Sequence, residues 1–273
     1  MLGVATTQVM QMPGVDLQFI MPLLLQFFLA SLRIGAFLLS APIFGARWLS
    51  LRVRVIMAMS LAAAVIHHVP PMDVSQLNTA AGLSMIFVEL AIGLASGLVL
   101  SIWFAAMLLA GEKIASSAGL GYAAQVDPAT GAQTPVVSQI LYLFLLVVFL
   151  SVDGHLLAIG TILDSYRLIP IGSPIAFDVL IGAGISAAGY MFLAATIIML
   201  PITMVLVMIN VTIGIITRSA PQLNLFSFGF PISLLAVFFI MFFSAGAFGE
   251  SARSLIDSAL QSVQTMLGAL PNG

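Results

Sequence analysis

The stretch RSAPQLNLFSFGFP, from Arg218 to Pro231, is a short polar turn between two very apolar segments. Within it, Gln222 and Asn224 place amide groups in an apolar setting, where an unmade hydrogen bond costs about 1–3 kcal/mol. We expect the stretch to join two helices, and we expect the two amides to fix the turn or to bind a neighbouring subunit. The candidate residues of this turn are Arg218, Pro221, Gln222, Asn224, Phe226, Gly229, Phe230 and Pro231.

The composition around this turn is typical of a membrane protein. Of 273 residues, 61% are hydrophobic and 7% are charged, and the mean hydropathy is +1.19. A soluble domain carries about 25% charged residues. The apolar runs lack a period of two residues, which favours spanning helices over a closed β-barrel. We therefore predict an all-α membrane-type protein with long, kinked apolar helices and helical hairpins.

Six apolar runs can be distinguished, at residues 17–45, 53–69, 79–110, 136–163, 176–217 and 230–248. The run from Ala176 to Thr217 would be about 60 Å long as one helix, which is about twice the hydrocarbon thickness of a bilayer. Pro201 can kink this helix but does not divide it into two spans. Such helices are either steeply tilted or face other protein over much of their apolar surface, and we favour the second alternative.

The C-terminal segment from Glu250 has a different pattern, because its apolar residues recur at helical spacing while Ser, Gln and Asp257 occupy the other face. These apolar residues are Leu255, Ile256, Ala259, Leu260, Val263, Met266, Leu267 and Leu270. The pattern predicts an amphipathic helix. Such a helix either lies on the membrane surface or docks against a neighbouring subunit.

A few polar residues interrupt the apolar runs. Arg33 and Glu89 would each cost roughly 2.5–3.5 kcal/mol if left unpaired at the centre of a spanning helix. They are either buried, paired groups or charges that line a pore, and we favour the first alternative because no regular series of charges marks a relay. We interpret Asp153 and His155 as partners in a hydrogen bond at a helix end or between helices. The candidate buried polar residues are Arg33, Glu89, Glu112, Asp153, His155 and Asn210.

The sequence has no recognisable catalytic motif. It contains no phosphate-binding loop with Gly-Lys-Ser/Thr and no H-E-x-x-H pattern. The absence of cysteine excludes disulfides and thiolate metal sites, and the net charge of −2 is too small to indicate a nucleic-acid partner. We therefore predict that the protein is not an enzyme and binds no cofactor, metal or nucleic acid.

The segment from Gly119 to Pro135 is a long loop rich in glycine and proline. The sequence Asp127-Pro128-Ala129-Thr130-Gly131 within it favours a turn. Because irregular backbone is tolerated at membrane depth only inside protein or beside water, this loop is either exposed at the surface or folded into a channel.

Several motifs, taken in order, resemble the FliR/SctT family of type III secretion export-gate subunits. They lie at residues 33–45 (RIGAFLLSAPIFG), 111–114 (GEKI), 127–128, 153–155, 168–172 and 200–201, at Asn210 and Gly214, and in the turn that begins at Arg218. The resemblance implies a single integral domain with a FliP-like part at residues 1–175, followed by a FliQ-like helical hairpin and C-terminal helix at residues 176–273.

The resemblance also implies a role in protein export. Proteins of this kind form, with FliP and FliQ, a helical hetero-oligomeric pore for unfolded flagellar proteins, with one copy of the FliR-like chain. FlhB and FlhA are further partners, and the pore lies in the bacterial inner membrane at the flagellar basal body. The loop at residues 118–134 corresponds to a pore plug. Its candidate residues are Gly119, Gly121, Tyr122, Gln125, Asp127, Pro128, Gly131 and Pro135.

Two alternatives to a flagellar export subunit remain. The first is the related SctT subunit of the injectisome, because the motif ending in Gly229-Phe230-Pro231 only favours the flagellar branch. The second is a small-solute transporter, which should show repeat symmetry and a polar site near the bilayer midplane. Neither feature is apparent in the sequence.

Overall fold

The computed structural model describes residues 17–66, 80–119, 136–220 and 229–272, and its regular elements in these ranges are helices. They are α1 (Leu17–Ser40), α2 (Leu51–Val65), α3 (Ala80–Ser117), α5 (Val136–Ser151), α6 (Gly154–Leu168), α7 (Phe177–Ser219), α8 (Phe230–Phe243), α9 (Ala245–Ala269) and the short 3₁₀ helix η5 (Leu270–Asn272). The prediction of an all-α fold is confirmed.

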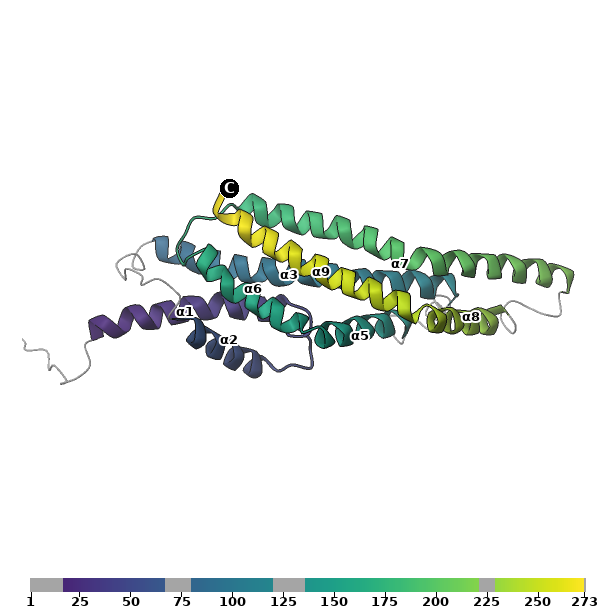
Figure 1. Cartoon of the computed structure of the whole chain (residues 1–273), viewed down its shortest axis with the longest axis horizontal. Helices are drawn as coiled ribbons and strands as arrows, with labels where there is room; N and C mark the ends of the chain where they lie inside the picture. Colours follow the sequence, from purple (N-terminus) through teal and green to yellow (C-terminus); the bar gives the residue numbers. More distant parts are fainter. Residues whose placement is uncertain (1–16, 67–79, 120–135, 221–228, 273) are drawn as a thin grey trace, which may run out of the picture.

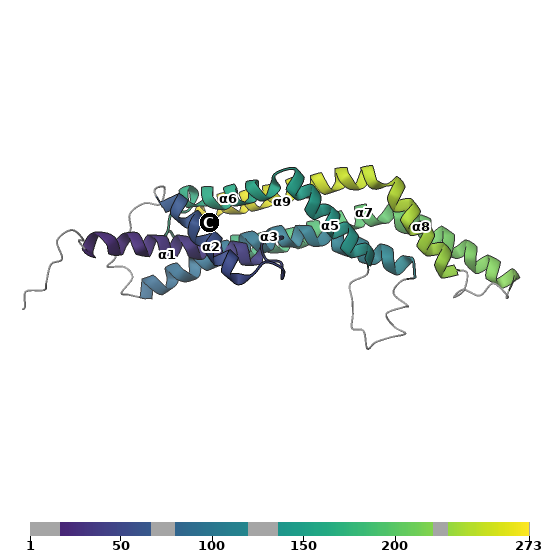
Figure 2. The ribbon, with the colours of Figure 1, turned by 90° about the horizontal axis from the view of Figure 1, so that it is seen from below.

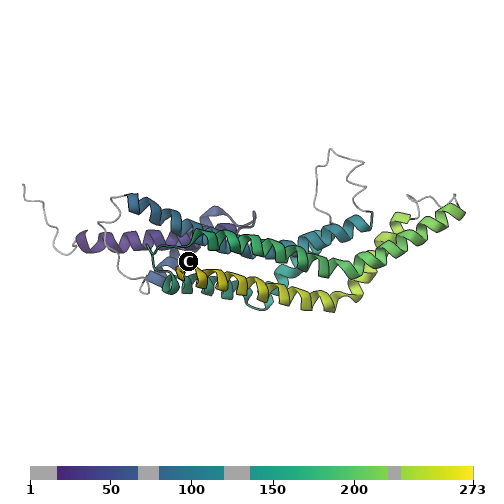
Figure 3. The same cartoon turned by 90° about the horizontal axis from the view of Figure 1, so that it is seen from above.

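The helices form an elongated bundle whose long axis follows α3 and α7 (Figure 1). Helix α3 lies at its centre and packs against α1, α5, α7 and α9. The chain runs outward along α7 and returns along α8 and α9, so that α7 and α9 lie side by side (Figure 3). One continuous hydrophobic core therefore includes side chains from both the N-terminal and the C-terminal parts of the chain.

Three of these helices are long and apolar enough to cross a membrane, namely Ile20–Ser40, Gly82–Ser117 and Phe177–Ser219. Two further pairs of helices, α5–α6 and α8–α9, are long and apolar enough to cross a membrane only if each pair counts as one span. The helices of these pairs meet at bends of 68° and 66°. This composition and these lengths agree with the prediction of a membrane protein.

Helix α7 is the overlong helix that the sequence predicts. It is continuous over 43 residues and passes through Pro201 without ending, which gives it a length of about 65 Å. Of its most apolar 18-residue stretch, only 22% is buried within the chain. Most of the apolar surface of α7 is therefore available to lipid or to other proteins.

The amphipathic helix predicted near the C-terminus exists, but both alternatives for its apolar face are wrong. This face of α9 packs inside the chain, against α3, α5, α6 and α7. Its buried residues are Phe248, Ala252, Leu255, Ile256, Ala259, Leu260, Val263, Met266 and Leu267. The cause is the bend at Ser244, because it directs α9 back over the bundle instead of away from it.

Helices α1 and α3 approach each other closely at two glycines. A methyl group on Gly97 would overlap the Ser40 hydroxyl and lie 2.7 Å from the Ala41 nitrogen, and one on Gly93 would lie 2.8 Å from the Ala36 Cβ. These glycines form a G-x-x-x-G motif, which brings membrane helices into backbone contact. This contact between α1 and α3 was not predicted, although the G-x-x-x-G motif at Gly93 and Gly97 can be seen in the sequence.

Candidate functional site

A buried ion pair joins α1 to α3. The Arg33 Nε donates to Glu89 Oε2 at 2.7 Å, and Arg33 Nη2 donates to Oε1 at 3.0 Å. Both side chains are fully buried. This two-pronged geometry is the strongest arrangement that an arginine and a carboxylate adopt. In the isolated chain the two charges therefore form a buried pair and do not line an open pore.

Helix α6 completes the surroundings of this pair. Arg33 Nη1 donates to Ser165 Oγ and Nη2 donates to the Ile169 carbonyl, each at 3.0 Å. The guanidinium carbon lies 4.3 Å from the centre of the Tyr166 ring, and the Tyr166 hydroxyl donates to the Ala30 carbonyl at 2.6 Å. The polar cluster therefore holds α1, α3 and α6 together. Neither Ser165 nor Tyr166 was predicted from the sequence, because their proximity to Arg33 exists only in the folded chain.

Three of the residues predicted to be buried are exposed in the isolated chain. Glu112, Asp153 and Asn210 have exposed side chains, and His155 is half-buried. Glu112 lies near the end of α3 and Asp153 lies at the bend between α5 and α6, where water reaches the side chain.

Asp153 shapes the backbone of this bend. Its φ of 55° is left-handed, and its carbonyl accepts hydrogen bonds from the N–H groups of Leu156 and Leu157 at 2.9 and 3.0 Å. Its side chain makes no capping bond. Within the described part of the chain, the buried His155 Nδ1 has no hydrogen-bond partner. The predicted bond between helices at this motif is therefore not formed by the described residues.

Asn210 connects three helices despite its exposure. Its Nδ2 donates to the carbonyl of Ser117 at 2.8 Å, and its Oδ1 accepts from Ser233 Oγ at 3.1 Å. Ser117 is the last residue of α3, Asn210 lies in α7 and Ser233 lies in α8. The amide therefore anchors the end of α3, directly before the Gly-rich loop begins.

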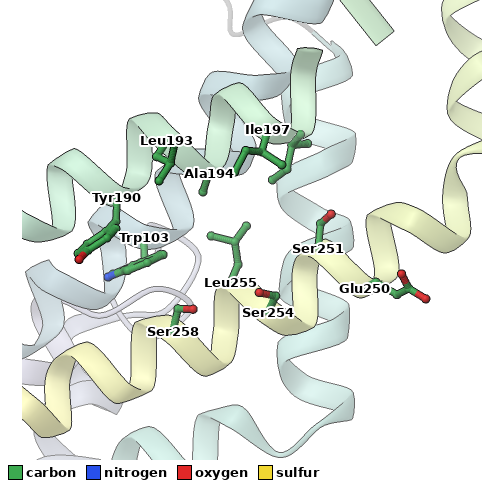
Figure 4. Close-up of a pocket in the computed structure, with 11 residues that line it drawn as sticks. Trp103, Tyr190, Leu193, Ala194, Ile197, Glu250, Ser251, Ser254, Leu255 and Ser258 are labelled. Carbon is green, nitrogen blue, oxygen red and sulfur yellow. The ribbon is translucent and has the colours of Figure 1, made fainter. Parts of the chain in front are cut away.

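A groove runs between α7 and α9, with Trp103 of α3 at its base (Figure 4). It consists of two adjoining cavities of about 390 and 520 Å³, which share Trp103, Tyr190 and Ser258. The Trp103 and Tyr190 rings stack with their centres 5.6 Å apart. The lining combines apolar side chains of α7 with a row of polar residues on α9. This row comprises Glu250, Ser251, Ser254, Ser258, Gln261, Ser262 and Thr265.

The chemistry of this groove is suited to binding. Among the described residues that line it, Glu250 and Tyr190 are the titratable groups, and this part of the lining holds no paired acid and base for catalysis. Among the described residues, the buried Trp103 Nε1 has no hydrogen-bond partner. This groove could not be predicted from the sequence, because it depends on the packing of α9 against α7.

The remaining predicted residues are described only in part. Gly119 has a φ of 84° directly after α3, Arg218 is exposed in the last turn of α7, and Gly229 and Pro231 lie at the start of α8. Phe230 is the first residue of α8. Gly121, Tyr122, Gln125, Asp127, Pro128, Gly131, Pro135, Pro221, Gln222, Asn224 and Phe226 lie outside the described residues. In the described ranges, no three His, Asp or Glu side chains are grouped so that they could hold a metal ion.

Comparisons with known proteins identify the family. A family model described as "Bacterial export proteins, family 1" matches residues 24–259. The flagellar biosynthetic protein FliR of Pectobacterium carotovorum subsp. carotovorum is 35% identical over 213 residues, which cover 77% of this chain and 80% of the relative. FliR of Escherichia coli K12 is 34% identical over 209 residues, covering 76% and 79%. The surface presentation of antigens protein SpaR of Shigella flexneri is 32% identical over 165 residues, covering 59% and 62%. The chain therefore belongs to family 1 of the bacterial export proteins.

Proposed function

We propose that this chain is a non-enzymatic subunit of the flagellar type III export gate. In this role it assembles with FliP and FliQ into an inner-membrane pore for unfolded flagellar proteins, with FlhB and FlhA as further partners at the flagellar basal body. The names of the FliR relatives and the export family support the proposal. So does the chemistry of the described residues, which offers surfaces for binding and no catalytic constellation.

The observation that carries the proposal is the exposed apolar surface of α7 and α8. Helix α7 is about 65 Å long, whereas the hydrocarbon core of a bilayer is about 30 Å thick. Lipid therefore cannot cover its whole length, and apolar patches of this size outside lipid mark contacts with other proteins. The exposed large side chains on the distal half of α7 and on α8 include Met204, Val207, Met208, Val211, Ile215, Leu235, Phe239, Phe242 and Phe243.

We also propose the division into a FliP-like part at residues 1–175 and a FliQ-like part at residues 176–273. The antiparallel arrangement of α7 with α8 and α9 supports this division, because it has the form of a helical hairpin whose returning arm is bent by 66°. The two parts share one core, so we expect them to fold together as one domain.

Assembly can be tested by expressing the tagged chain with and without FliP and FliQ of the same organism. We expect the chain to elute from size-exclusion chromatography in one complex with both partners, and to aggregate or be degraded without them. The Gln222→Leu/Asn224→Leu variant should lower the yield of this complex, because it removes the amides from the turn after α7. A monodisperse, folded chain that ignores both partners would overturn the proposal.

We propose that the Gly-rich loop between α3 and α5 plugs the pore. Both ends of this loop are firmly attached to the bundle. Asn210 holds the Ser117 carbonyl, and Gly111 allows α3 to approach α5, because a methyl group there would lie 2.5 Å from the Ser138 Cα. A gate needs a segment with two accessible arrangements, and the glycines at positions 121 and 131 of this sequence favour such a segment.

Deleting residues 121–131 should leave assembly intact and make the membrane permeable to small ions. The reason is that the removed segment is the proposed barrier, whereas the helices that hold the subunit together remain. Conductance of the reconstituted complex measures this effect, and a Gly189→Ala variant is the matched control, because no atom lies within 4 Å of its added methyl group. A deletion complex that is fully assembled and as tight as the parent would show that this loop is not the plug.

The match to SpaR supports a second candidate function, as the corresponding subunit of an injectisome. Complementation distinguishes the two branches. Restored motility in a flagellar strain that lacks its own FliR supports the flagellar assignment, whereas restored secretion only in an injectisome mutant supports the other.

A further inference from the structure

Three arginines follow the first candidate span in the sequence. Arg47, Arg52 and Arg54 are three of the eight basic residues of the chain, and no acidic residue lies between Asp16 and Asp73. The span from Ile20 to Ser40 contains 21 residues, which is about the thickness of the hydrocarbon core. Arg47 lies in the connection after this span, and Arg52 and Arg54 lie in the first turn of the returning helix α2, so we expect all three near the lipid headgroups.

Trp48 lies within the same segment and is 71% exposed. Tryptophan is enriched at the interface between membrane and water, because its ring is apolar and its N–H is polar. Arg47 and Arg52 are exposed beside it in the sequence. The segment therefore places a residue typical of the membrane–water interface next to two exposed positive charges.

An apolar crevice extends from this segment between α1 and α2. Helix α2 turns back beside α1 (Figure 2), and the two helices leave a crevice of about 260 Å³ whose lining also includes Leu90 of α3. Its walls include Leu32 and Leu39 on α1 and Val55 and Met59 on α2. These walls offer a site for a hydrocarbon chain at the depth of the bilayer.

Arg54 is the charged residue among the described residues that line this crevice. Its Nη2 donates to the Ala46 carbonyl, which fixes the position of the guanidinium. Its Nε is buried and has no hydrogen-bond partner among the described residues. A guanidinium that is held in place at the wall of an apolar crevice is suited to an anionic oxygen at the mouth of that crevice, and its planar fork of N–H donors matches phosphate well.

We propose that this site binds an anionic phospholipid of the bilayer, with its phosphate at Arg54, one acyl chain in the crevice between α1 and α2, and the exposed charges of Arg47 and Arg52 adding to the attraction for the headgroup. The charge of the segment and the apolar walls select a ligand that carries both a negative headgroup and a hydrocarbon chain. A free phosphate ion would satisfy the arginines but would leave the crevice empty. The inference depends on the membrane location of the chain and not on its role in export.

Photocrosslinking tests the proposal on the full chain in membranes, together with any subunits that accompany it. Membranes that contain the tagged chain are loaded with phosphatidylglycerol or phosphatidylcholine carrying a diazirine in one acyl chain. We expect stronger labelling by phosphatidylglycerol, at residues of α1 and α2. Each of the changes Arg47→Gln, Arg52→Gln and Arg54→Gln should lower this preference about fivefold, which corresponds to about 1 kcal/mol per basic residue at a membrane surface.

The controls separate this site from general attraction and from misfolding. The Arg167→Gln/Arg253→Gln variant removes two other exposed basic residues and should keep the full preference. Unchanged labelling of the arginine variants by phosphatidylcholine shows that they remain folded in the membrane, and the variants of the exposed Arg47 and Arg52 serve if Arg54→Gln is degraded. Equal labelling by both lipids, an unchanged preference in the arginine variants, or loss of labelling on addition of inorganic phosphate would overturn the proposal.

Discussion

Replacing Glu89 by leucine while Arg33 remains is expected to destabilise the chain by about 3–5 kcal/mol. The change removes the carboxylate that accepts from Arg33 Nε and Nη2 and leaves a fully buried guanidinium without its counter-charge. The two remaining acceptors, Ser165 Oγ and the Ile169 carbonyl, are neutral and cannot compensate for that charge. The melting temperature of the detergent-solubilised complex should fall by roughly 6–20 °C.

Two control variants distinguish loss of the pair from loss of any acid. In the Arg33→Met/Glu89→Leu variant both charges are absent, and we expect most of the stability to return, because replacing a buried pair by apolar residues of similar size is often neutral. Glu112→Gln changes an exposed acid on the same helix and should shift the melting temperature very little. If Glu89→Leu melts like the parent, the pair is not essential for holding α1, α3 and α6 together.

Replacing Gly97 by leucine is expected to separate α1 from α3 and to reduce stability by about 3 kcal/mol or more. The new side chain would overlap Ser40 Oγ and approach both the Ala41 nitrogen and the Phe37 carbonyl, at 2.7 and 2.8 Å. Two of these three atoms belong to the backbone and cannot rotate away. The change should also break the bond that Ser101 Oγ donates to the Ser40 carbonyl at 2.6 Å.

The measurement is the amount of folded chain in membranes, followed by its melting temperature in detergent. Gly160→Leu is the matched control, since Gly160 lies in α6 and has no atom within 4 Å of an added methyl group. We expect Gly160→Leu to accumulate like the parent and Gly97→Leu to be depleted. Equal accumulation of the two variants would mean that α1 and α3 tolerate a wider separation.

Much of the helical structure could be predicted from the sequence. The apolar run predicted at residues 176–217 is the helix Phe177–Ser219 of the structure. This run contains no polar turn that could divide it, and in lipid the backbone N–H and C=O groups of such a segment are paired within one helix. The run predicted to extend from residue 136 to residue 163 is divided into α5 and α6 at the left-handed Asp153, a break that its apolar composition conceals.

The sequence by itself determined the class of the protein, the overlong helix of residues 177–219 and the presence of an amphipathic C-terminal helix, because these follow from local composition and periodicity. Only the tertiary structure decided which residues meet. Ser165 lies 132 residues from Arg33 and yet binds it, and the apolar face of α9 packs onto α3 instead of onto a membrane or a neighbour. The direction of α9 depends on the bend at Ser244, and the meeting of Arg33 with Glu89 depends on the close contact at Gly93 and Gly97. Both are properties of the packed helices, which no single segment of the sequence contains.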